Sequence, residues 1–113
     1  MDMELKKLLD IYWKEYMIGH LYLSPKKEYV FKYDKDGVEV AKNNGFDYLI
    51  GFSDLDKEYV SRSLFPVFKS RIPPRNRHNI NEILNELKID TYDEIELLRK
   101  TRGKSFSDDL ETR

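Results

Sequence analysis

Short apolar and aromatic runs alternate with polar residues through the first third of the chain, a pattern typical of antiparallel strands. The runs at 8–13 and 17–23 flank a polar break at 14–16 and predict the two strands of a hairpin. A turn follows at 24–27, because its proline presets the backbone and cannot join a central ladder. The alternating segment 29–33 then predicts a third strand.

The next stretch favours two more short strands, at 38–41 and 46–52, separated by residues that tolerate a positive φ angle. Asp34-x-Asp36-Gly37 resembles the beginning of a calcium loop. It lacks the third oxygen ligand before the glycine and the distal glutamate that such a loop requires. We therefore interpret 34–37 as an Asp-Gly turn between strands.

From about residue 52 the apolar residues follow a helical period instead. The segment 63–68 predicts a short helix, with Pro66 tolerated in the first turn and the prolines after Ile72 ending it. Apolar residues at i, i+3, i+4 and i+7 predict an amphipathic helix from residue 79 onward; they are Ile80, Ile83, Leu84 and Leu87.

A last helix is predicted before Gly103. Thr91 and Glu94 have the spacing of a capping box, and Arg99 and Lys100 suit the negative end of the helix dipole. Strands followed by helices predict an α+β fold, with a small antiparallel sheet or partial barrel and about three helices. We expect one domain over 1–113, with a core at 8–104 and a tail at 105–113 that could be flexible.

Composition narrows the class of protein. The 113 residues contain no cysteine, and 20 basic and 21 acidic residues leave a net charge of −1, which argues against a general nucleic-acid or membrane-surface binder. Aromatic residues at 13% argue against disorder. No apolar run approaches the roughly 18 residues of a membrane span, and the charged start does not resemble a signal peptide. We expect a cytoplasmic protein.

The sequence offers little for catalysis, so no catalytic residue, metal ligand or cofactor is predicted. The glycines form no phosphate-binding loop, and only His20 and His78 could supply imidazole ligands. We interpret His20 as a strand residue at a hydrogen-bonded or solvated position. Asp54, Asp56 and Glu58 are interpreted as a solvated charge cluster where a helix begins.

One segment has the composition of a docking surface. Cations and aromatic side chains gather around the Pro73-Pro74 break, and arginine and aromatic residues dominate protein–protein interfaces. The candidate partner-binding residues are Phe65, Phe68, Lys69, Arg71, Arg75 and Arg77, with His78 beside them. The alternative is that both phenylalanines belong to the core and the cations merely solvate a loop.

The order of these segments resembles the HipA N-terminal domain family. Residues 11–21 resemble its opening hairpin, with Ile18-Gly19 at the family's valine–glycine position. Residues 29–34 are similar to the family's Tyr-x-Phe-x-Tyr-Asp strand.

Two later segments, 65–73 and 95–103, resemble the family's proline segment and its closing Leu-Leu helix with a glycine turn. The resemblance covers about residues 8–110. The chain departs from the pattern at Pro74-Arg75, where the longer proteins have Glu-Gly, and at Arg102, which replaces a glycine.

The resemblance implies a function that composition does not. In HipA this domain is fused to a kinase core, which is absent here, and the chain looks like the small subunit of the tripartite HipBST toxin–antitoxin systems. It would therefore bind and restrain a HipT-like Ser/Thr kinase, with a HipB-like helix-turn-helix DNA-binding protein as third partner. We expect an antitoxin-like, non-enzymatic protein that covers the kinase active site, with no direct nucleic-acid or membrane partner.

Two alternatives stay open. The protein could complete or stabilise a kinase complex without inhibiting it. It could instead be a small nucleic-acid module that uses the cations of 69–77 together with Arg99, Lys100, Arg102 and Lys104, in which case its binding would depend strongly on salt.

Overall fold

A computed structural model describes residues 4–105 and 108–113. Over these residues the chain forms five strands and four helices, arranged in a sheet of order β4-β3-β2-β1-β5. In chain order the elements are β1 (Lys6–Trp13), β2 (Tyr16–Leu23), β3 (Tyr29–Tyr33), α1 (Lys35–Lys42), β4 (Tyr59–Ser61), α2 (Pro66–Lys69), α3 (Ile80–Leu87), α4 (Glu94–Thr101) and β5 (Leu110–Thr112).

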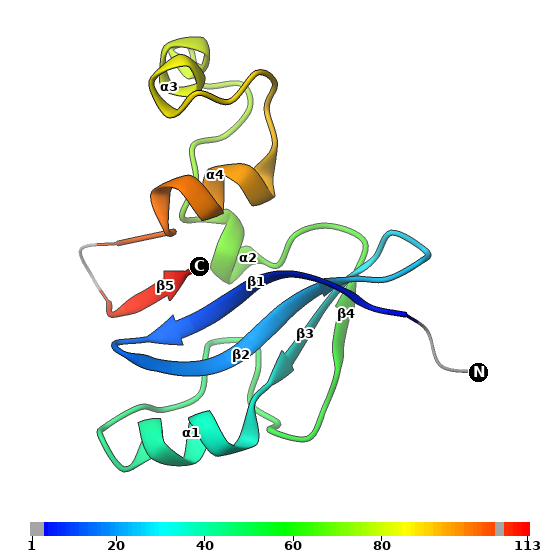
Figure 1. Ribbon diagram of the computed structural model, residues 1–113, viewed down its shortest axis with the longest axis vertical. Coiled ribbons are helices and arrows are strands. Elements are labelled where there is room, and N and C mark those ends of the chain that lie inside the picture. Colours follow the sequence, from blue (N-terminus) through cyan, green and yellow to red (C-terminus); the bar gives the residue numbers. More distant parts are fainter. Residues whose placement is uncertain (1–3, 106–107) are drawn as a thin grey trace.

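The sheet confirms the predicted hairpin, the third strand and the α+β class. Strands β1 and β2 pair antiparallel, with Leu9 opposite Leu21 and Ile11 opposite Gly19, and β3 pairs with β2 over its whole length. Among the described residues the sheet is open, with β4 and β5 at its edges, and does not close into a barrel. In Figure 1, α1 lies below β2, and α2 and α4 lie above β1; buried residues of all three helices share one hydrophobic core.

The strand predicted at 38–41 is wrong, because this segment belongs to helix α1. Asp34 forms its N-cap, and its carboxylate accepts a hydrogen bond of 2.8 Å from the Gly37 backbone N–H. Val38 and Ala41, one helical turn apart, are buried against the sheet. Two valines in eight residues resemble a strand, because β-branched side chains favour strands.

The strand predicted at 46–52 is also wrong, because this segment is a loop held to the sheet at several points. Phe46 and Phe52 are buried, and the buried Tyr33 hydroxyl binds the segment between them. This hydroxyl donates to the Phe52 carbonyl at 2.5 Å and accepts from the Leu49 N–H at 3.0 Å. The apolar residues of this segment therefore reflect anchoring points and not a pleated strand.

No helix begins at the acidic cluster, contrary to expectation. Asp54, Asp56 and Glu58 lie in the loop before β4. Two of them pair with lysines of neighbouring elements, Asp56 with Lys35 at 2.6 Å and Glu58 with Lys32 at 3.3 Å. All three acids are exposed, so the solvated part of the interpretation holds and the helix does not.

The three predicted helices of the second half are present as α2, α3 and α4. Helix α4 begins at a different cap from the one predicted: the Asp93 carboxylate, not Thr91, accepts the N–H groups of Ile95 and Glu96. An aspartate directly before the first turn satisfies these donors without needing the reciprocal bond of a capping box.

Strand β5 lies within the segment that the sequence analysis left as a flexible tail. It pairs antiparallel with β1, where Leu110 lies opposite Trp13 and Thr112 opposite Ile11. Leu110 and Thr112 are buried, and the Thr112 hydroxyl donates to the Leu98 carbonyl of α4 at 2.8 Å. A three-residue strand that follows two aspartates carries no periodic signal, so only its pairing reveals it.

The close approach of α1 to β2 yields a test. A Cβ at Gly37 would lie 1.8 Å from the Met17 carbonyl oxygen. Gly37→Ala is therefore expected to lower the free energy of unfolding by about 2–3 kcal/mol, as overpacking does. Helix propensity alone would raise it by about 1 kcal/mol. Urea denaturation decides the sign, with Glu39→Ala on the exposed face of the same helix as control; a more stable Gly37→Ala protein would contradict the packing described.

Candidate partner-binding surface

The two phenylalanines of the candidate surface belong to the core. Phe68 is fully buried and Phe65 is 8% exposed. Both contact the Phe52 ring, with centroid distances of 5.1 Å for Phe65 and 6.2 Å for Phe68, and Phe52 in turn lies 4.6 Å from Phe31 of β3. The core alternative therefore describes both residues, because their rings pack within the aromatic cluster.

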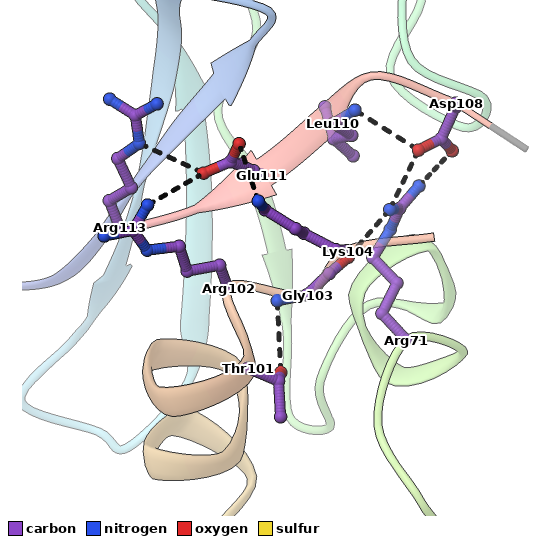
Figure 2. Close-up of polar contacts among 9 residues, drawn as sticks. All are labelled: Arg71, Thr101, Arg102, Gly103, Lys104, Asp108, Leu110, Glu111 and Arg113. Carbon is purple, nitrogen blue, oxygen red and sulfur yellow. Dashed lines mark hydrogen bonds and ion pairs between the residues drawn. The ribbon is translucent and has the colours of Figure 1, made fainter. Parts of the chain in front are cut away.

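Arg71 is also withdrawn from the surface, with a side chain only 8% exposed. Its Nε donates to the Val67 carbonyl and one Nη to the Gly103 carbonyl, both at 2.9 Å. The guanidinium also forms two hydrogen bonds with the Asp108 carboxylate, one of them 3.1 Å long (Figure 2). A buried arginine is stable only when its donors are satisfied in this way, so its role is structural.

The Asp108 carboxyl group, which pairs with Arg71, has a lowered pKa. The hydrogen bond from Arg71 lowers the pKa of the Asp108 carboxyl; burial opposes this, and the Leu110 N–H and the charge of Arg71 lower it further. The Asp108 carboxylate also accepts from the Leu110 N–H at 3.2 Å (Figure 2). The ion pair therefore connects α2 to the first residue of β5.

The other three candidates are exposed cations. Lys69 is 60% exposed and lies 4.0 Å from the Glu94 carboxylate, at the limit of an ion pair. Arg75 and Arg77 are exposed as well. Arg75 lies over the Tyr92 ring at 4.7 Å, and Arg77 donates to the Asn79 side chain at 2.9 Å. Of the seven arginines, all within the described residues, only Arg62, Arg75 and Arg77 form no ion pair.

Two of these cations, Lys69 and Arg75, border a pocket of about 770 Å³ beside α2 and the start of α4. Ile72, Pro74 and Tyr92 contribute its apolar surface. Its lining residues are Lys69, Ser70, Ile72, Pro74, Arg75, Asn76, Tyr92 and Glu94. The sequence analysis missed Tyr92 and Glu94, because no local spacing links them to the segment 69–77.

A second group of cations lies at the C-terminal strand. Glu111, with a side chain 19% exposed, is within 4 Å of three cations: Arg113 at 3.3 Å, and Arg102 and Lys104 at 3.8 Å (Figure 2). Arg99 pairs with Glu96 in the same helix and donates to the Leu8 carbonyl. Several of the cations that the nucleic-acid alternative requires are therefore engaged by acids of the protein itself.

His20 lies between two carboxylates. Its Nδ1 is 2.8 Å from Asp10 Oδ1, and its Nε2 is 3.8 Å from Asp34 Oδ2, so the hydrogen-bonded reading of this histidine is confirmed. Burial raises the pKa of the Asp10 carboxyl, but hydrogen bonds from His20 and Lys7 outweigh this and lower it overall. Among the described residues, no group of three or more histidine, aspartate or glutamate side chains has the arrangement of a metal site.

Comparison with known proteins gives one match. The model of a family described as the HipA N-terminal domain matches residues 9–105. No curated protein and no solved structure matches the chain. Among the described residues, none of the helices is long and apolar enough to cross a membrane.

The Arg71–Asp108 pair yields a prediction. Asp108→Asn is expected to lower the free energy of unfolding at pH 7 by about 1–2 kcal/mol. This is the usual contribution of a hydrogen bond to a charged group, reduced because Asp108 is partly exposed to solvent. Because the folded-state pKa is the lower one, the contribution of Asp108 is present above its unfolded pKa of about 4 and is lost as the pH falls below it.

Urea denaturation of both proteins between pH 7 and pH 2 measures this difference, which should shrink at the acid end. Asp109→Asn, an exposed neighbour, is the control. An equal difference at all pH values would contradict the ion pair.

Proposed function

The chain belongs to the HipA N-terminal domain family, which indicates a HipA-related toxin–antitoxin context, and from this membership we propose that it binds and restrains a separately encoded Ser/Thr kinase of the HipA/HipT type. The observation that carries this proposal is the match over residues 9–105. The matching family model describes the N-terminal domain of HipA proteins and not their kinase domain. The protein is proposed to act by binding, without enzymatic activity of its own.

The proposed contact is the cationic segment between α2 and α3, formed by Lys69, Arg75 and Arg77. Two features support it. The Arg77 N–H donates to the Pro74 carbonyl at 3.1 Å and the Ile80 N–H to the Arg77 carbonyl at 3.0 Å, so consecutive turns hold the loop. A loop that is already ordered loses little conformational entropy when it binds.

Inhibition would follow from occlusion. A kinase active site holds its magnesium ions with acidic side chains, and arginine forms strong paired hydrogen bonds with carboxylates. We propose that Arg75 or Arg77 covers or enters that cleft. The buried Phe65, Phe68 and Arg71 act indirectly, because they fix the ends of the segment on the core.

The same proposal extends to the assembly. The protein would take the part of HipS, the small subunit of HipBST systems, and a HipB-like helix-turn-helix DNA-binding protein would join the kinase as third partner. Because a DNA-binding partner would meet the complex inside the cell, we propose a cytoplasmic location.

The test uses a purified HipA/HipT-type kinase encoded beside this protein. Micromolar mixtures are expected to elute as one complex in size-exclusion chromatography. With this protein at about 100 times Kd, about 1% of the kinase stays free, and autophosphorylation should fall in proportion.

A complex that keeps its full kinase activity would contradict restraint and favour the structural-subunit alternative. Failure to form any complex at micromolar concentration would contradict both. Salt-sensitive binding of the isolated protein to DNA or RNA would instead favour the nucleic-acid alternative.

A further inference from the structure

We propose that the pocket between α2, the loop 73–76 and the start of α4 binds an acidic peptide segment of a protein partner. A carboxylate of this peptide lies between Lys69 and Arg75, and an adjacent apolar side chain of the peptide lies on Ile72, Pro74 and Tyr92. This deepens the proposed function, because it states the chemistry that the kinase would present to the cationic segment.

The walls of the pocket are already in place without a ligand. The Tyr92 hydroxyl donates to the Pro73 carbonyl at 2.7 Å, which ties the segment just before α4 to the proline break. Arg75 lies on the Tyr92 ring at 4.7 Å, and this contact orients its guanidinium beside the pocket. Burial raises the pKa of Tyr92, Glu94 raises it further and Arg75 lowers it, so the hydroxyl stays protonated and keeps donating at neutral pH.

The charges of the pocket favour a carboxylate. Lys69 and Arg75 face a single acid, Glu94, and the stretch from 69 to 81 contains no aspartate or glutamate. The one ion pair here, between Lys69 and Glu94, is 4.0 Å long, and its lysine is 60% exposed and therefore available. A singly charged carboxylate balances the net charge of +1 that these three side chains leave, whereas a doubly charged phosphate would leave an unbalanced negative charge beside Glu94.

The apolar part of the pocket favours a peptide over a nucleic acid. Ile72 is 8% exposed at the base, and Pro74 and the Tyr92 ring extend this apolar surface towards the rim. Nucleic-acid binding needs a track of cations that follows several phosphates. The cations around Glu111 are partly neutralised and do not provide such a continuation.

The first experiment tests the pocket itself by NMR titration of the ¹⁵N-labelled protein. The probes are a synthetic hexapeptide of alternating glutamate and leucine, its glutamine–leucine counterpart, inorganic phosphate and a single-stranded DNA oligonucleotide. The glutamate peptide is expected to shift the amide signals of 69–76 and 92–94 with a Kd at least about tenfold below that of the glutamine peptide. Arg75→Glu should abolish these shifts.

The matched control is Lys42→Glu in α1, which lies away from α2 and α4 (Figure 1); Lys42 also lies over a tyrosine ring, at 4.8 Å from Tyr48. This charge reversal should leave peptide binding unchanged. Equal binding of the two peptides, shifts outside the pocket, or tighter binding of phosphate or of the oligonucleotide at these residues would each overturn the proposal.

The second experiment uses the kinase. Arg75→Glu and Lys69→Glu are expected to weaken the complex about tenfold or more, and Lys42→Glu to leave its Kd within about twofold. A kinase that binds the wild-type protein but ignores Arg75→Glu would overturn the pocket and leave the proposed function standing. A kinase that never binds would overturn the proposed function, while the peptide titration would still decide the pocket.

Discussion

The buried guanidinium of Arg71 is the interaction on which the second half of the structure depends. It joins three segments that are distant in sequence: the last turn of α2, the Gly103 turn after α4, and the beginning of β5 at Asp108. Because a buried cation cannot remain unpaired, these acceptors must meet in one place. Their meeting brings β5 against β1, where the Arg113 N–H and the Asp10 carbonyl bond at 2.8 Å.

The aromatic cluster below this ion pair explains which side chains remain for binding. Phe31, Phe52, Phe65 and Phe68 pack their rings together between the sheet and α2. The phenylalanines therefore stabilise the fold, while Lys69, Arg75 and Arg77 of the proposed partner surface stay exposed. A rigid loop with exposed arginines on a packed base suits an electrostatic contact, in which charge sets partner choice and the rate of encounter more than raw affinity.

The residues that resemble the HipA N-terminal domain have clear physical roles in the structure. A Cβ at Gly19 would lie 2.8 Å from the Lys32 carbonyl oxygen and 2.8 Å from the Phe31 ring, so this position needs a glycine. Asp34, which ends the aromatic strand, caps α1. Arg102 has a left-handed backbone, with φ of 59°, where the resemblance had suggested a glycine. The matched segments are thus those where the chain turns or packs most closely.

The sequence by itself determined the hairpin, the third strand and helix α3, because each has an apolar period that shows which face is buried. It determined helices α2 and α4 mainly through the proline, charge and glycine signals at their ends. The sequence also identified the segment 65–77 as a candidate docking surface. Only the tertiary structure decided that 38–41 is helical, that 110–112 is a strand, and that Arg71 points inward while Arg75 points to a pocket completed by Tyr92. Most of these outcomes depend on partners far along the chain: β5 pairs with β1, Tyr92 binds Pro73 at a separation of 19 residues, and Arg71 binds Asp108 at a separation of 37. Local propensity carries no information about such partners.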